Sequence, residues 1–149
     1  MSESRSIELR LESKIDSVDA VELIVQGLAR EAGFDAAEID HLGMAVRESM
    51  VNAVTHGNGY NKDKAVHFAV RLEDGKLTIS IRDEGKGFDP KDVPDPTAPE
   101  NLLKTSGRGL LLMNALVDEF QVGPAEPCGT RVTLVKSGPG RESEKKEER

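Results

Sequence analysis

Cysteine, tryptophan and long apolar runs are what this sequence has little of or lacks. Its 149 residues include one cysteine, Cys128, and no tryptophan. A single cysteine excludes an intrachain disulfide and fits a reducing compartment. No apolar segment reaches the roughly 20 residues that span a membrane, and residues 1–5 begin no signal-peptide core. We therefore expect a cytoplasmic protein without a membrane partner.

Aromatic residues are also scarce, and acidic residues outnumber basic ones by 27 to 20. Aromatics make up 3% of the chain and hydrophobic residues 37%, so the core must be aliphatic. The formal net charge is -7. A direct nucleic-acid partner is disfavoured, because phosphate contacts need clusters of Lys and Arg. A single nucleotide stays possible, since its pocket needs only local donors. The length suits one domain with a real core.

Two hydrophobic periods divide the chain into elements. A helical period predicts a helix from a cap at Ser17 or Asp16 to about residue 31, stopped by Gly33, and a second from Asp35 to about residue 56, stopped by Gly57. A third, shorter helix is expected over residues 110–117. Alternation predicts strands over residues 7–11, 66–72, 77–81, 119–122 and 130–135, the second and third forming a hairpin.

Two segments show neither period. Residues 88–106 carry four prolines, and a structureless loop of that length in a compact domain is usually functional. Residues 138–149 are rich in charge and predict a solvated tail. The expected organisation is one domain over residues 1–137 followed by this tail.

Glu48 and Asn52 are the first candidate site residues. They stand four apart in the second predicted helix, so they project from one face. An amide oxygen is a neutral ligand for Mg²⁺, which keeps waters beside few protein ligands. The carboxylate could act as a general base. Taken alone, the pair is more often an ordinary polar helix face.

Two glycine signatures follow. Asp83 stands at a strand end before Gly85 and Gly87, where a carboxylate can accept a hydrogen bond from an exocyclic amine and glycine lets backbone approach a flat ring. A plain turn has the same composition. Gly107-Arg108-Gly109 precedes the third predicted helix, where N–H groups and an arginine could contact phosphates. Loop flexibility at a helix entry is the alternative.

Other ligand sites are excluded by the spacing. Gly75-Lys76 is followed by Leu77, so there is no Walker A loop, and neither glycine signature has the third glycine of a dinucleotide fingerprint. The three histidines do not cluster with Cys128, which argues against zinc.

Taken together, four boxes resemble the GHKL ATPase superfamily in order and spacing. The boxes are Glu48-xxx-Asn52-Ala53, Asp83-x-Gly85-x-Gly87, Gly107-x-Gly109-Leu110 and Gly129-Thr130. Within the superfamily, the chain resembles the bacterial anti-sigma-factor serine kinases. Typical of them are Asn52-Ala53-x-x-His56-Gly57-Asn58 and the two glycine signatures with their flanking residues. The similarity covers residues 7–136.

The resemblance implies an α+β Bergerat fold, a two-layer sandwich with a mixed sheet and helices on one face, that binds ATP and Mg²⁺. It assigns Asn52 to the metal, Glu48 to the catalytic base and Asp83 to the adenine amine, with residues 88–106 as an ATP lid. The remaining contacts it implies are Gly85 and Gly87 beside the adenine, Gly107, Arg108 and Gly109 at the phosphates, Leu110 as a further nucleotide-binding position, and Thr130 near the adenine water network.

Members of that family phosphorylate a serine of a STAS anti-anti-sigma protein and bind a sigma factor, commonly as homodimers. We therefore expect an anti-sigma factor with serine kinase activity. Two alternatives stay open. One is a non-catalytic ATP-binding module that sequesters a partner, and the other is a detached histidine-kinase catalytic domain. Glu48 favours the kinase, because binding alone needs no base.

Overall fold

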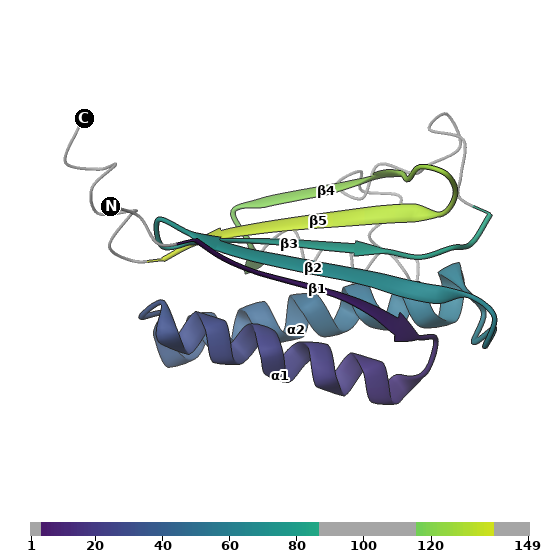
Figure 1. Cartoon of the computed structure of the whole chain (residues 1–149). Helices are drawn as coiled ribbons and strands as arrows, with labels where there is room; N and C mark the ends of the chain where they lie inside the picture. Colours follow the sequence, from purple (N-terminus) through teal and green to yellow (C-terminus); the bar gives the residue numbers. More distant parts are fainter. Residues whose placement is uncertain (1–3, 87–115, 139–149) are drawn as a thin grey trace, which may run out of the picture.

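A five-stranded sheet with two helices on one face forms the protein (Figure 1). The computed structural model describes residues 4–86 and 116–138. In chain order the elements are β1 (Ser4–Glu12), α1 (Ile15–Glu31), α2 (Ala36–Asn52), the π-helical turn η1 (Ala53–Gly57), β2 (Ala65–Glu73), β3 (Lys76–Arg82), β4 (Glu119–Pro124) and β5 (Thr130–Ser137). The expected lid, most of the expected helix over 110–117 and the tail from residue 139 lie outside the described residues.

The strand order is β1-β2-β3-β5-β4, and every pairing between described strands is antiparallel. The α+β two-layer architecture is confirmed, but the described sheet is antiparallel where the resemblance implied a mixed one. The connections explain this direction. Between β1 and β2 the chain reverses direction three times, on entering α1, α2 and β2. The two strands are therefore antiparallel. Tight hairpins join β2 to β3 and β4 to β5.

Helix α1 starts earlier than its sequence indicates. Its N-cap is Lys14, whose side chain makes no capping hydrogen bond. Ser17, one of the two expected caps, instead donates from Oγ to the carbonyl oxygen of Glu12 at 2.8 Å. This bond ties the first turn to the end of β1. Gly33 stops the helix as predicted, with a φ of 86° that favours glycine.

Helix α2 begins as predicted and ends differently. Asp35 is its N-cap and forms a reciprocal capping box with Glu38. The expected stop at Gly57 is also confirmed, but residues 53–57 form a π-helical turn. Its widened geometry is marked by the bond from Asn58 N to Ala53 O at 2.8 Å. This turn delivers the chain to the loop before β2.

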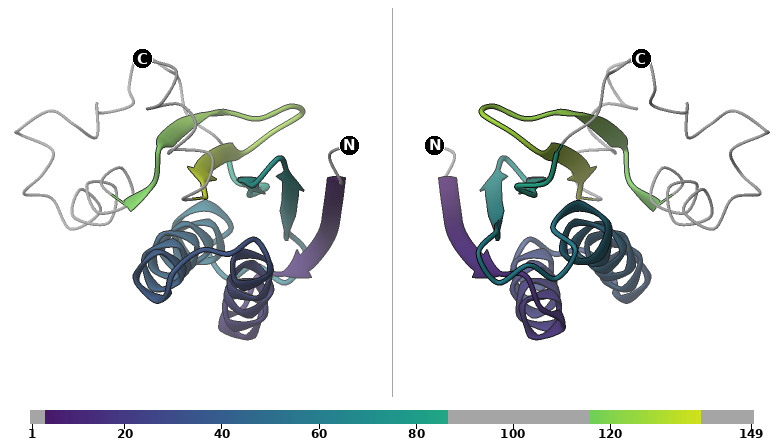
Figure 2. Two further views of the ribbon diagram at one scale, coloured as in Figure 1. Left: turned by 90° about the vertical axis from the view of Figure 1, so that its left-hand side faces the viewer. Right: turned by 90° about the vertical axis from the view of Figure 1, so that its right-hand side faces the viewer.

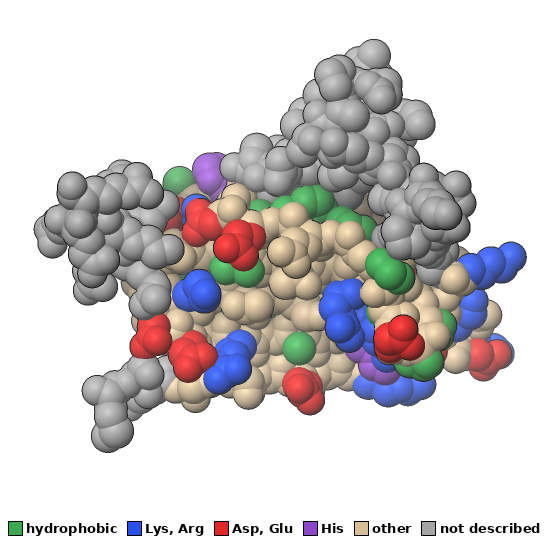
Figure 3. Space-filling model, turned by 90° about the horizontal axis from the view of Figure 1, so that it is seen from above, with side chains coloured by type: hydrophobic (Ala, Val, Ile, Leu, Met, Phe, Trp, Pro, Cys, Tyr) green, Lys and Arg blue, Asp and Glu red, His purple; other side chains and the backbone are tan. Residues whose placement is uncertain are grey.

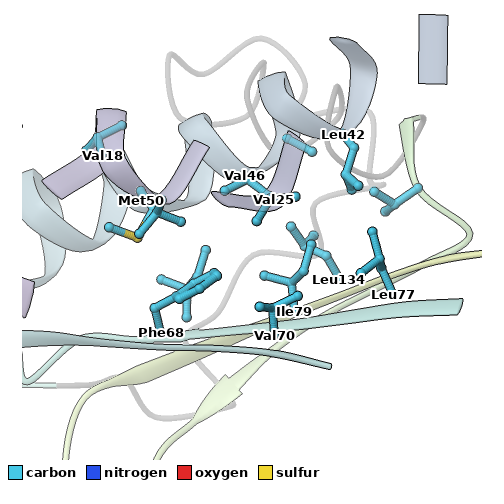
Figure 4. Packing of buried hydrophobic residues seen from close by; sticks show 14 of the residues in the cluster. Val18, Val25, Leu42, Val46, Met50, Phe68, Val70, Leu77, Ile79 and Leu134 are labelled. Carbon is cyan, nitrogen blue, oxygen red and sulfur yellow. The ribbon is translucent and has the colours of Figure 1, made fainter. Parts of the chain in front are cut away.

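The core fills the space between the helices and one sheet face (Figures 2 and 4). It is aliphatic, as the composition indicates, with Phe68 as its largest fully buried side chain. The inner face of α2 is buried from Ile39 to Met50. Figure 4 shows Val46 and Met50 of α2 directed toward the strands that carry Phe68 and Ile79. No helix among the described residues is both long and apolar enough to cross a membrane.

Candidate functional site

A cavity of about 510 Å³ opens beside the end of α2, where β3 finishes and β5 begins. Three apolar side chains line one part of it, Ile81, Val122 and Val132. Polar lining comes from the helix end and from the segment after β3. The polar and charged side chains are Ser49, Asn52, His56, Asn58, Lys64, Asp83, Lys86 and Thr130. The cavity therefore offers an apolar surface beside hydrogen-bonding groups, which is the make-up of a small-ligand site.

Asp83 is the buried anchor of this cavity. It is only 6% exposed. Its Oδ1 accepts from the backbone N–H of Gly85 at 2.9 Å and of Thr130 at 3.1 Å. Its own N–H donates to the carbonyl oxygen of Thr130 at 3.0 Å. These bonds hold the carboxylate against two backbone segments, so Oδ1 is occupied and the side chain has a fixed direction.

Close backbone packing around Asp83 depends on glycine. A Cβ on Gly57 would overlap the Asp83 carboxylate, and a Cβ on Gly85 would overlap the carbonyl oxygen of Gly57. Gly129 has a φ of 89°, and a Cβ there would overlap the carbonyl oxygen of Asp83. Three segments distant in sequence thus meet with no side chain between them. This explains why the boxes carry glycine at these positions.

Asn58 connects the end of η1 to the backbone next to Asp83. It is 3% exposed. Its Nδ2 donates to Ser13 Oγ at 2.8 Å and to Ala65 O at 2.9 Å, while its Oδ1 accepts from Glu84 N at 2.7 Å. One side chain therefore joins the residue after β1, the start of β2 and the segment after β3. The position was noted in sequence as typical of the family, but nothing local in the sequence indicates this network.

Asn52 and Glu48 lie on α2, with different relations to the cavity. Asn52 lines it, together with Ser49 and Ala53. Glu48 is half-buried one turn earlier and is not among the lining residues. Neither side chain forms a hydrogen bond or ion pair with another of the described residues. Both are therefore available to a ligand that enters from the helix side.

The structure brings four of the predicted site residues to one cavity. They are Asn52, Asp83, Gly85 and Thr130. The other five binding positions lie outside the described residues and stay predictions: Gly87, Gly107, Arg108, Gly109 and Leu110.

Several residues that line the cavity were not among the site residues predicted from the sequence. Lys64 and Lys86 supply positive charge, and His56 and Ser49 supply polar atoms. Lys86 could have been found, because it lies inside the box Asp83-x-Gly85-x-Gly87. Lys64 has no such signal, since a lysine in a polar loop is ordinary. Cys128 is exposed, outside the cavity lining.

Glu84, the residue after Asp83, pairs with a histidine on β2. Its Oε2 lies 2.5 Å from His67 Nε2 on β2. The hydrogen bond from His67 is the main cause that lowers the pKa of Glu84, and burial opposes it. A backbone hydrogen bond from Ala65 lowers the pKa further. The residue after Asp83 is thereby held as a carboxylate.

Known proteins are similar to this chain in sequence. The family described as the histidine kinase-like ATPase domain matches residues 11–136. A protein named serine-protein kinase RsbW from Bacillus licheniformis is 34% identical over 124 residues, 78% of this chain and 76% of that protein. A protein named anti-sigma F factor from Clostridium acetobutylicum is 30% identical over 132 residues, 87% of this chain and 92% of that protein.

Solved structures show the same fold. The crystal structure of the RsbU and RsbW domains of a Mycobacterium tuberculosis protein superposes with a TM-score of 0.64 at 23% identity. The match covers 90% of this chain and 32% of that longer one. The mycobacterial sensor histidine kinase MprB has a TM-score of 0.55 at 18% identity, over 89% of this chain and 98% of that one. The matched family, its named relatives and the site geometry agree, so the chain belongs to the histidine kinase-like ATPase domain family, among the anti-sigma serine kinases.

Proposed function

We propose that this protein is an ATP- and Mg²⁺-dependent serine kinase that also acts as an anti-sigma factor. Its substrate would be a serine of a STAS anti-anti-sigma protein, and its other partner a sigma factor, with the kinase working as a homodimer in the cytoplasm. The observation that carries the proposal is the Asp83 corner. A buried carboxylate is fixed by two backbone N–H groups at the floor of a half-apolar cavity.

The cavity residues fit adenine. Oδ1 of Asp83 is held by backbone N–H groups, which leaves Oδ2 to accept from an exocyclic amine. Ile81, Val122 and Val132 offer an apolar surface for a flat ring. Gly85 removes a side chain that would block close approach. A hydrogen-bond acceptor beside an apolar surface therefore suits a base that carries an amino group.

Other residues of the cavity fit the phosphates and the metal. Lys64 and Lys86 line the cavity and would balance phosphate charge. Asn52 would supply a neutral oxygen ligand to Mg²⁺. When bound, that ion would offset the charge that develops on the transferred phosphoryl group.

Glu48 is the proposed general base. Phosphoryl transfer to serine needs a group that accepts the hydroxyl proton. Glu48 is half-buried, has no partner among the described residues and shares a helix face with Asn52. It lies beside the cavity lining rather than in it, where a hydroxyl from a second protein would have to enter. A purely ATP-binding module would need no carboxylate at this position.

The test uses the full chain and the variant Asp83→Asn. This change keeps an acceptor for the two N–H groups and replaces the acceptor that faces the cavity with a donor. We expect a loss of roughly 1.5–3 kcal/mol in ATP binding, about ten- to a hundredfold in Kd, by calorimetry with Mg²⁺. Asp63→Asn, in the exposed loop before β2, is the matched control and should bind ATP like wild type.

A second measurement separates the kinase from a binding module. Wild-type protein is incubated with radiolabelled ATP and the STAS proteins of the same genome. Label on a STAS serine supports the proposal. ATP binding without transfer to any STAS protein would favour the binding module, and equal ATP affinity in Asp83→Asn would exclude the adenine assignment.

A further inference from the structure

The sheet face that turns away from the helices carries a row of basic residues. The strand register places Arg10 opposite His67, His67 opposite Arg82, and Arg82 opposite Arg131. The row therefore crosses four strands in one line, from β1 to β5. Figure 3 looks onto this face and shows Lys and Arg side chains gathered toward its right-hand end, with an acidic side chain among them.

Within this basic row, Arg82 on β3 and Arg131 on β5 lie directly opposite each other. Like charges directly opposite each other on neighbouring strands are destabilising. Among the described residues, none of the three arginines forms an ion pair. Arg82 makes only a long hydrogen bond of 3.4 Å to the carbonyl oxygen of Cys128. An acidic chain of net charge -7 thus keeps three arginines in one row without an ion pair to another described residue, two of them directly opposite each other.

The row borders a hollow in the sheet. Small side chains form its floor, Ala69 and Ser80, and the three arginines line it. Its volume is about 370 Å³. A second hollow of about 470 Å³ shares Ala69, Ser80 and Glu8 with the first, so the depression continues along the strands. A sheet face of small residues beside exposed guanidinium groups can bind a segment of another protein.

Acidic groups near the row neutralise only part of its charge. Glu8 lines the hollow. Glu84 is bound by His67 and lies close enough for the charge of Arg10 to help lower its pKa. Three arginines therefore face two carboxylates, one of them already hydrogen-bonded to the histidine. The remaining charge of this end of the face is positive.

We propose that this basic row is a docking surface for a carboxylate-rich segment of a partner protein. Neighbouring strands lie about 4.8 Å apart, so Arg10 and Arg131 stand roughly 14 Å apart. That is the length of about four residues of extended chain. A short run of Asp or Glu would place carboxylates against all three guanidinium groups, which bind carboxylates in forked geometry.

A protein segment fits better than a nucleic acid. Nucleic-acid affinity grows with the number of phosphates neutralised over a long track, and the rest of this chain is acidic. The row offers three cations over a short distance. It also lies on the sheet face away from α1 and α2, so this docking is separate from ATP binding. It adds a contact for a partner and does not depend on the proposed kinase activity.

The test measures binding of a fluorescent peptide of alternating glutamate and serine to the full chain at low ionic strength. The row variant is Arg10→Gln, Arg82→Gln and Arg131→Gln combined. We expect it to bind about tenfold more weakly or worse, since three surface ion pairs are lost. The control variant combines Arg30→Gln, Lys62→Gln and Lys76→Gln, which removes the same charge from exposed positions elsewhere and should bind like wild type.

Thermal melts check the fold of both variants. The row variant should melt at the wild-type temperature or above it, because repulsion across the strands is removed. If it melts lower, Arg10→Gln alone, on the edge strand β1, replaces it and should weaken binding a few-fold. Equal weakening by the row and control variants, or no binding by wild type, would overturn the proposal. Tighter binding of single-stranded DNA than of the peptide, lost in the row variant, would overturn the choice of a protein partner.

Discussion

The two sides of the candidate site are built in opposite ways. On the sheet side, Asp83 is buried, hydrogen-bonded to two backbone segments and enclosed by glycines. On the helix side, Glu48 and Asn52 project from α2 with no hydrogen bond to another described residue. The hydrogen bonds of the sheet side are formed within the protein before any ligand binds. The side chains of the helix side gain partners only when ligands bind.

This difference matches the two tasks that the proposed reaction needs. Recognition of a base gains from groups fixed in advance, because nothing has to be ordered on binding. A metal ligand and a proton acceptor must instead exchange partners during each turnover. Substitutions on the helix side should therefore change chemistry, and those on the sheet side should change binding and stability.

The largest effect is expected from Glu48→Gln. The change keeps size and hydrogen-bonding capacity but removes the base. Phosphoryl transfer to the STAS serine should fall by about 10²- to 10⁴-fold. ATP affinity should stay, because Asp83 and Asn52 remain. A kinase assay beside an ATP titration measures both.

Asp40→Asn is the matched control for this change. It lies on the exposed face of the same helix and should keep full activity. If Glu48→Gln retained the wild-type rate, the base assignment would be wrong. If it lost ATP binding as well, the two sides of the site would not be separable as described.

Asn58→Ala should have the next largest effect, on stability. It leaves Glu84 N and Ala65 O without their partner in a buried place. Each unsatisfied buried group costs about 1–3 kcal/mol, so the free energy of unfolding in urea should fall by at least that much. Lys62→Ala, in the exposed loop before β2, should change it by less than about 0.5 kcal/mol. Equal effects would show that the Asn58 network does not hold the corner.

The smallest effect is expected on the stability of the protein at acidic pH. The pKa of Glu84 is lowered from its ordinary value of 4.5, mainly by the hydrogen bond from His67. A lowered pKa in the folded state contributes stability that is present above the unfolded value and lost as pH falls through the folded one. Wild type should therefore lose stability more steeply below pH 4.5 than Glu84→Gln. Parallel stability curves would contradict this.

Most of the fold could be predicted because its signals are local. Asp35 caps α2 as its residue type indicates, and the hairpin turn falls at Asp74 and Gly75, both with positive φ. The start of α1 was misplaced because Ser17 bonds to Glu12 O, a contact that depends on how β1 enters the helix. The sheet direction was misjudged because it follows from helix connections rather than from strand patterns.

The candidate site was predictable in part for the same reason. The cavity residues Asn52, Asp83 and Thr130 were expected from their boxes. The contributions of Asn58 and Lys64 were not, since they depend on how distant segments meet. Asn58 contacts Ser13, which lies 45 positions earlier. No local period carries information about such a pair.

The π-helical turn between α2 and Asn58 sets a length requirement on this chain. A π turn accommodates one residue more than the α-helical path. Deleting any one of residues 53–57 would let the backbone continue as ordinary helix, with its hydrogen bonds intact. The following residues would then be rotated by about 100° around the helix axis, and Asn58 would no longer face Ser13 and Ala65. Homologous chains that differ in length should therefore place their insertions and deletions outside this turn.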